Sequence, residues 1–247
     1  MLSHFNIIKL DAISSTNEFL KKKCKSSKCK DGEIIWAKDQ TNGKGQSLNK
    51  WLSQRGKSLT VSVYKEFDQL RTSNAFVLNA CITLSIVNVL KKIGLNEVSI
   101  KWPNDIMAGN KKIGGILIEN IIKSEYIKSS IIGIGLNINE HKFVNLPYAT
   151  SLFLEINKKI KLKKILDILI EELFKSFNQL NNRENNIINL FSSSLWKLNK
   201  DVHFKNKNQD FTAKVKGVKL SGNLIIEFSD GSISDFNSNE IKMNYID

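Results

Sequence analysis

The stretch SIKWPNDIMAGNKKIGGILIEN, from Ser99 to Asn120, decides the fold of this chain. Pro103 forces the residue before it into an extended conformation and stops a strand after Lys101, so the pattern predicts a corner. Gly114 and Gly115 weaken the strand that follows, and glycines there commonly mark close approach by a ligand or another backbone. A plain hairpin with exposed lysines is the alternative interpretation.

The composition indicates a globular protein. The chain has 247 residues, of which 41% are hydrophobic and 25% charged, enough for one substantial core. A net charge of +13 invites nucleic-acid binding. The lysines are scattered along the whole chain, however, and this distribution argues against specific nucleic-acid binding.

The cysteines and the termini bear on the compartment. Cys24, Cys29 and Cys81 indicate no disulfide framework and favour a reducing compartment. Neither they nor the histidines predict a metal site. We find no signal peptide and no apolar run of the roughly 20 residues that a membrane span needs. The expected location is the cytoplasm.

Strands and helices alternate irregularly over the first 199 residues. A helix is expected from about Ser15, with Ser14, Ser15 or Thr16 as its cap. The segment from Thr41 to Lys50 lacks periodicity and predicts a long loop. Strands are predicted at residues 6–11, 33–40, 59–64, 111–120 and 129–139, a buried helix at 72–93, an amphipathic helix at 162–180 and a shorter helix ending near 199.

The texture changes after Asn199, where short alternating strands are separated by polar turns. We predict an α+β fold: a mixed sheet with packed helices in residues 1–199, followed by a small C-terminal β-barrel in residues 200–247. Four phenylalanines of the barrel are expected to face its core: Phe204, Phe211, Phe228 and Phe236.

Glycine-rich phosphate motifs are excluded. The segment RGKS lacks the first glycine of a P-loop, and NGKGQSL carries Leu48 where a dinucleotide-binding turn needs glycine. What remains is a loop with two glycines, a lysine between them and Trp51 at its end, which suits an anion or a solvated surface. Gly133 and Gly135 leave one face of a later strand flat, where a planar ring or a packed side chain fits.

Taken together, these residues resemble the biotin protein ligases. The resemblance runs in order through STN at 15–17, Gln40, the NGKG loop, Trp51, KWPND at 101–105, KKIGGILIE at 111–119 and GIGLNIN at 133–139. It covers nearly the full chain. It implies a catalytic domain like those of biotin, lipoate and class II synthetase enzymes, with a C-terminal SH3-like barrel.

The resemblance also implies a reaction in two steps. Biotin and ATP give biotinoyl-5′-AMP and pyrophosphate, and a lysine of the biotin carboxyl carrier protein of acetyl-CoA carboxylase then displaces AMP. Two anions repel each other, so the site needs fixed cations. By resemblance, Lys112 is the leading catalytic residue, Lys101 the second cation, and Asp105 accepts or orients the proton of the incoming lysine.

The ligand-binding residues follow from the same resemblance. Lys44, Lys112 and Asn137 are expected to bind the nucleotide, and Mg²⁺ to be held mostly by phosphate oxygens rather than by a protein site. The residues expected around biotin are Ser15, Thr16, Asn17, Gln40, Lys44, Gly45, Gln46, Trp51, Lys112, Gly115 and Leu117.

The chain departs from the family pattern in its glycine loop, where the family has arginines and this sequence has Lys44 and Gln46. Lysine keeps the charge but loses the bidentate fork, and glutamine loses the charge. We therefore expect weaker retention of the adenylate. The helix at Ser15 starts too early for a preceding DNA-binding domain, so a ligase without repressor function is expected.

Two other functions stay open. A lipoate or octanoate ligase of related fold is the nearest alternative, and a basic nucleic-acid-binding module is the other. The sequence does not report the oligomeric state, and a monomer and a sheet-edge homodimer are equally open.

Overall fold

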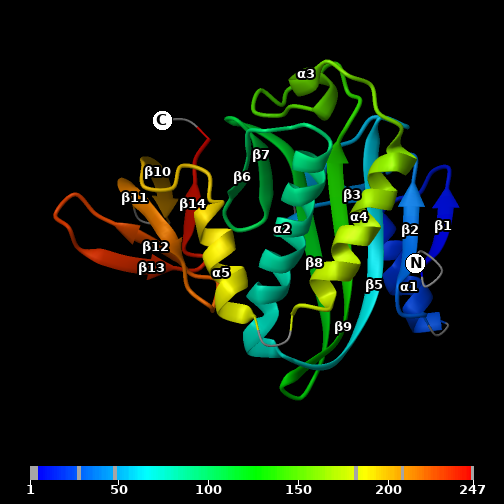
Figure 1. The fold of residues 1–247 in the computed structure, drawn as a ribbon, viewed down its shortest axis with the longest axis horizontal. Coiled ribbons are helices and arrows are strands. Elements are labelled where there is room, and N and C mark those ends of the chain that lie inside the picture. Colours follow the sequence, from blue (N-terminus) through cyan, green and yellow to red (C-terminus); the bar gives the residue numbers. More distant parts are fainter. Residues whose placement is uncertain (1–4, 27–28, 47–48, 181–182, 207–208, 246–247) are drawn as a thin grey trace. The chain divides into compact units, whose positions relative to one another are not determined.

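The computed structural model describes residues 5–26, 29–46, 49–180, 183–206 and 209–245 (Figure 1). The chain forms two compact units, which are described separately below. Unit 1 consists of Met1–Thr72 and Lys112–Glu171, and unit 2 of Ser73–Lys111 and Glu172–Asp247.

Unit 1 is built on a mixed sheet with the order β1-β2-β5-β9-β8. Its strands β1 and β2 run parallel, whereas the pairs β2–β5, β5–β9 and β8–β9 are antiparallel. The strands are β1 (Asn6–Leu10), β2 (Glu33–Ala37), β5 (Ser58–Arg71), β8 (Lys111–Lys123) and β9 (Tyr126–Asn137). The mixed sheet confirms the predicted fold class.

Helix α1 (Thr16–Ser26) lies against β2, β5 and β9 (Figure 1). It begins where the sequence predicts, because the backbone N–H of Glu18 donates a long hydrogen bond of 3.5 Å to Ser15 Oγ. Leu20 points into the core with Ile35, Tyr64 and Ile131 around it. The start of this helix is thus fixed against the sheet.

The helices α3 (Leu152–Ile156) and α4 (Leu162–Phe177) follow β9 in the chain. The predicted amphipathic pattern of α4 is confirmed, since its apolar positions Ile165, Leu166, Leu169 and Leu173 are all buried.

The glycine loop is shorter than expected. Residues 41–50 were predicted to be one long loop, but β3 (Gly43–Lys44) and β4 (Lys50–Trp51) pair as a small antiparallel hairpin. Gly43 makes this possible, because a side chain there would lie 2.5 Å from the carbonyl oxygen of Trp51. Leu48, where the family has glycine, lies outside the described residues.

The cysteine prediction is wrong. Cys24 and Cys29 form a disulfide, with Cα atoms 5.0 Å apart, and Cys81 is a buried free thiol. The last turn of α1 brings Cys24 within bridging distance of Cys29, which lies five residues on. The cysteines therefore give no argument for a reducing compartment.

Unit 2 begins within a 3-10 turn, η2 (Thr72–Asn74), that leads into α2 (Ala75–Lys92). Helix α2 packs on α5 (Glu184–Ser193) and on the hairpin of β6 (Val98–Lys101) and β7 (Asp105–Ala108).

The segment Thr72–Lys92 bears on the expectation that the chain has no membrane span. It has 21 residues and a mean hydropathy of 1.6 over its most apolar window, so by length and composition it reaches the membrane-spanning range. Within that window 61% is buried in the structure, as in the core helix of a folded domain. It is the one such helix among the described residues.

The C-terminal strands form a five-stranded antiparallel sheet with the order β13-β12-β11-β10-β14. In the described part of the chain this sheet is open, whereas a closed barrel was predicted. The aromatic prediction is confirmed for Phe204, which is fully buried, whereas Phe211, Phe228 and Phe236 are half-buried. The ring centroid of Phe211 lies 5.5 to 6.2 Å from those of the other three. The strands are β10 (Asp201–Asn206), β11 (Asp210–Val218), β12 (Leu224–Glu227), β13 (Ile233–Phe236) and β14 (Ile241–Met243).

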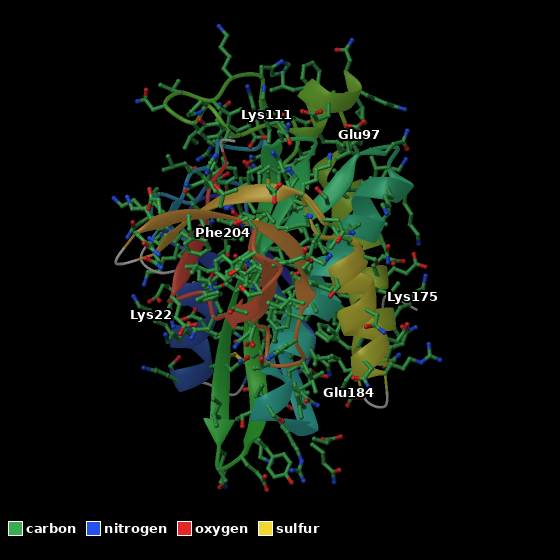
Figure 2. All side chains as sticks on the ribbon, turned by 90° about the vertical axis from the view of Figure 1, so that its left-hand side faces the viewer. Lys22, Glu97, Lys111, Lys175, Glu184 and Phe204 are labelled. Carbon is green, nitrogen blue, oxygen red and sulfur yellow. A yellow bond between two sulfur atoms is a disulfide. The ribbon has the colours of Figure 1, made fainter. Side chains whose placement is uncertain are left out.

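Figure 2 shows how this sheet is packed. Phe204 lies among the C-terminal strands and is fully buried, while Lys175 of the same unit projects outward. Phe211, Phe228 and Phe236 are half-buried and contact one another or Phe204 through their rings.

Candidate active site

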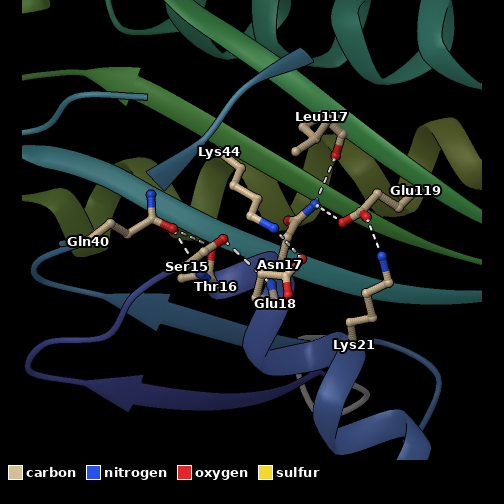
Figure 3. Close-up of polar contacts among 9 residues, drawn as sticks. All are labelled: Ser15, Thr16, Asn17, Glu18, Lys21, Gln40, Lys44, Leu117 and Glu119. Atoms are coloured by element: carbon tan, nitrogen blue, oxygen red, sulfur yellow. Dashed lines mark hydrogen bonds and ion pairs between the residues drawn. The ribbon is translucent and has the colours of Figure 1, made fainter. Parts of the chain in front are cut away.

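A network of small polar side chains surrounds the start of α1 (Figure 3). Ser15, Thr16 and Asn17 are all buried. The side-chain oxygen of Gln40 accepts hydrogen bonds from Thr16 N at 2.8 Å and from Thr16 Oγ1 at 3.1 Å. Gln40 is brought there by a parallel bridge with Ile13, so the residues predicted from STN and Gln40 do meet.

Ser62 and Glu119 complete this network, although the sequence analysis did not select them. Ser62 Oγ lies 2.5 Å from Asn17 Oδ1, and because that oxygen only accepts, Ser62 donates. Asn17 Nδ2 donates to Glu119 Oε2 at 3.0 Å and to the carbonyl oxygen of Leu117 at 3.4 Å. Lys21 pairs with the other Glu119 oxygen at 2.8 Å. The amide of Asn17 is thereby held in one orientation.

The glycines of β9 make room for two of the predicted side chains. A side chain at Gly133 would lie 2.4 Å from Asn17 Oδ1, and one at Gly135 would lie 2.4 Å from the Trp51 ring. Gly115 of β8 is the register partner of Gly135, so the flat area extends over both strands. The planar group that covers part of it is the Trp51 indole.

Trp51 carries a buried donor with no acceptor. Its indole Nε1 has no hydrogen-bond partner among the described residues. A buried donor left unpaired costs free energy, so such a group marks a place where a ligand or water accepts.

Lys112 stands beside this indole. Its Nζ lies 5.9 Å from the centroid of the Trp51 ring, and its side chain is half-buried. The backbone of Lys112 is fixed by two hydrogen bonds, donating to Tyr148 O at 2.6 Å and accepting from Thr150 N at 2.9 Å. The ammonium group is therefore carried by a strand whose start is fixed by two backbone hydrogen bonds to the segment before α3.

The hairpin of β3 and β4 supplies Lys44 and the residues after it. Lys44 Nζ pairs with Glu18 of α1 at 2.8 Å, and this contact is the main reason why the pKa of Glu18 lies below its ordinary value (Figure 3). The pair is too exposed to add much stability. Gly45 N donates to Asn49 O at 2.7 Å, and Gln46 is exposed.

Asn137 ends β9 and is buried. Its Nδ2 donates to Thr150 O at 3.0 Å, which ties the strand end to the segment before α3. Close by in sequence, Glu140 is 1% exposed; it accepts from Ser58 Oγ, and its Oε2 has no partner in the described residues. Burial raises the pKa of Glu140 above its ordinary value of 4.5.

Unit 1 therefore brings together most of the predicted site. Lys101 and Asp105 belong to unit 2, where they are register partners at the ends of β6 and β7. This KWPND corner is held by contacts with other parts of unit 2. Trp102 Nε1 donates to Gly222 O at 2.9 Å, and Asn79 Nδ2 donates to Pro103 O at 2.9 Å. Tyr245 contacts the side chains of both Lys101 and Asp105. Tyr245 lies 140 residues from Asp105 in the sequence, and no local motif predicts its contact with the corner. Within the described residues, no group of His, Cys, Asp or Glu side chains suits a metal ion.

The chain is similar to several known proteins. Residues 10–137 match the family model described as "Biotin/lipoate A/B protein ligase family". The "Bifunctional ligase/repressor BirA" of Bacillus subtilis is 26% identical over 235 residues, which cover 92% of this chain and 70% of that protein. The protein of the same name from Escherichia coli is 33% identical over 129 residues, which cover 52% of this chain.

Solved structures agree with these matches. The "Biotin protein ligase from Aquifex aeolicus in complex with biotin and ATP" superposes with a TM-score of 0.81 at 25% identity, covering 97% of this chain and 98% of that one. The match to the Escherichia coli relative, by contrast, covers only 39% of that protein's length. The family model spans more than half of this sequence, and the chain belongs to the biotin/lipoate A/B protein ligase family.

Proposed function

We propose that this chain is an ATP-dependent biotin protein ligase. In the first step a carboxylate oxygen of biotin attacks the α-phosphorus of ATP and pyrophosphate leaves, giving biotinoyl-5′-AMP. In the second step the amine of an acceptor lysine attacks the acyl carbon, AMP leaves, and the amine loses a proton. The proposed acceptor is the biotin carboxyl carrier protein of acetyl-CoA carboxylase.

One observation carries the proposal: amide and hydroxyl groups at the start of α1 and the ammonium group of Lys112 flank the same flat apolar area. Thr16, Asn17 and Gln40 present amide and hydroxyl groups, which suit the polar edge of an uncharged ureido ring. Trp51 supplies an apolar wall over Gly135. Lys112, within 5.9 Å of that wall, suits the carboxylate and the phosphate that must meet.

The remaining roles follow the same chemistry. We assign Ser15, Gln46, Gly115 and Leu117 to the biotin pocket, with Lys44 and Gly45 on the hairpin that closes over the ligand. Lys44 and Lys112 balance the charge of the phosphates, and Asn137 contacts the nucleotide. Lys101 is the second cation near the reaction centre, and Asp105 accepts or orients the proton of the acceptor lysine. Mg²⁺ enters with ATP and is held mainly by phosphate oxygens.

ATP–pyrophosphate exchange tests the proposal. We expect exchange that depends on biotin and is not supported by lipoate or octanoate. Adding the carrier protein should then increase its mass by one biotinoyl group at one lysine. Exchange driven by lipoate or octanoate instead would favour the other branch of the family. No exchange with any of the three acids would refute a ligase.

The proposed location is the cytoplasm, where ATP is available. The Cys24–Cys29 disulfide argues against this, since reducing compartments keep thiols reduced. Alkylation of thiols in intact cells, followed by mass spectrometry, shows whether the protein is in a reducing or an oxidising compartment. Finding Cys24 and Cys29 alkylated agrees with the cytoplasm.

A further inference from the structure

The KWPND corner of unit 2 holds two opposite charges that a third residue contacts. Lys101 is 7% exposed, an unusual degree of burial for an ammonium group. Asp105 is its register partner across the β6–β7 hairpin. Groups of this kind need fixed positions, because small displacements of a charge alter its interactions strongly where water is scarce.

Tyr245, just after β14, contacts both groups. Its phenol donates a hydrogen bond of 2.7 Å to Asp105 Oδ2. The face of its ring lies 4.0 Å from Lys101 Nζ, inside the range of a cation–π interaction. One side chain therefore orients the carboxylate through its oxygen and holds the ammonium group through its ring.

The phenol is a permanent donor. Burial, with the Asp105 carboxylate next, raises the pKa of Tyr245 far above its ordinary value. The hydroxyl group is thus protonated at every pH at which the protein works. A protonated phenol can keep donating to Asp105 Oδ2.

The chemistry of acceptor transfer explains why a fixed carboxylate matters. An acceptor lysine arrives as an ammonium ion and becomes nucleophilic only when its proton passes to a base. A carboxylate rotates freely about its last bond unless one oxygen is held, and a held carboxylate presents its second oxygen in a constant direction. Tyr245 supplies that restraint on Oδ2.

We propose that Tyr245 is a positioning residue for the transfer step, which orients Asp105 toward the incoming acceptor lysine. The inference rests on the proposed ligase function. Formation of the adenylate needs no proton acceptor of this kind, because biotin is already a carboxylate. Tyr245 should therefore affect transfer and leave adenylate formation intact.

Tyr245→Phe is the decisive variant, since it keeps the ring over Lys101 and removes only the hydroxyl group. We expect biotin-dependent pyrophosphate exchange at the wild-type rate. Single-turnover transfer from preformed biotinoyl-5′-AMP to the carrier protein should slow about tenfold, as expected for loss of a hydrogen bond to a charged group. The loss should lie in kcat, with the KM for the carrier protein unchanged.

The matched control is Tyr64→Phe. Tyr64 also donates a phenol hydrogen bond to a carboxylate, that of Glu66 at 3.2 Å, but it lies on β5. This variant should exchange and transfer like the wild type. If it slowed transfer as much as Tyr245→Phe, a general structural cause would replace the inference.

The remaining outcomes separate the two proposals. Unchanged transfer in Tyr245→Phe, with normal exchange, overturns the role of Tyr245 alone. An equal loss of exchange and transfer also overturns it, because the residue would then support the fold or the first step. If the wild-type protein shows no biotin-dependent exchange, the ligase function fails and the inference falls with it.

Discussion

The polar network at α1 and the KWPND corner are built from different kinds of side chain. Around α1 the contacts that link Thr16, Asn17, Gln40 and Ser62 join neutral amides and hydroxyls, which satisfy one another. In the corner, a lysine and an aspartate are held by an aromatic side chain. The first arrangement suits recognition of an uncharged ring, and the second suits movement of charge. Binding and chemistry should accordingly respond to different substitutions.

The most severe test of this division is Lys112→Ala. Removing the ammonium group should lower the rate of biotin-dependent pyrophosphate exchange by about 100-fold to 1000-fold, since a fixed charge at a reacting phosphate contributes that much. The KM for biotin should change little. Lys111→Ala, at the exposed neighbouring position, is the control and should retain exchange. An undamaged Lys112→Ala enzyme would remove Lys112 from the mechanism.

The converse substitution is Asn17→Ala. It removes the amide that Ser62 and Glu119 orient, so the KM for biotin in pyrophosphate exchange should rise about 10-fold to 100-fold with kcat largely retained. The control is Asn120→Ala, since Asn120 accepts from Ser130 on the same sheet. A fall in kcat without a change in KM would contradict the division between binding and chemistry.

Gln46→Arg adds a positive charge to the glycine loop. An arginine offers two parallel hydrogen bonds to a phosphate, so the adenylate should leave about tenfold more slowly. Stopped-flow or filter release of labelled biotinoyl-5′-AMP measures this rate. Asn42→Arg adds the same charge at an exposed position of the same loop and should not slow release. Equal release rates for the wild type and Gln46→Arg would show that this position does not retain the intermediate.

Glu140→Gln gives the smallest expected effect, and it concerns stability. Burial raises the pKa of Glu140 in the folded protein, so the folded state takes up the proton more readily than the unfolded state. The stability from this group is complete below its ordinary pKa of 4.5 and is lost as the pH rises through the raised folded value.

Urea unfolding at a series of pH values tests this directly. Relative to the wild type, Glu140→Gln should gain stability progressively as the pH increases above 4.5, because glutamine does not ionise. A constant difference between the two proteins over the whole series would show that Glu140 does not titrate differently in the folded state.

Local sequence patterns were sufficient for most of the fold. The mixed sheet, the buried helix at α2 and the amphipathic helix at α4 follow from the period of their apolar residues. The predicted barrel is an open sheet in the described residues, and local patterns could not show this because closure depends on pairing between distant strands. The disulfide was missed because cysteine spacing alone does not show that a helix end brings Cys24 toward Cys29.

The site divides in the same way. Thr16, Asn17, Gln40 and Trp51 lie in short motifs that the resemblance picks out, and the structure brings them together. Ser62, Glu119 and Tyr245 carry no motif, because each acts through a partner far away in sequence. Ser62 is one of three hydroxyl residues, with Ser58 and Thr60, in the buried half of β5, and local sequence does not single it out from the other two. Nothing in the local sequence around Tyr245 points to Asp105.

The flat area formed by Gly133 and Gly135 limits which substitutions this protein can accumulate in evolution. A single added methyl group at either position would occupy space that the Asn17 amide or the Trp51 indole now fills. Neighbours on separate segments therefore have to vary in pairs, position 133 with 17 and position 135 with 51. A single substitution that adds a side chain at position 133 or 135 is therefore disfavoured unless residue 17 or 51 also changes.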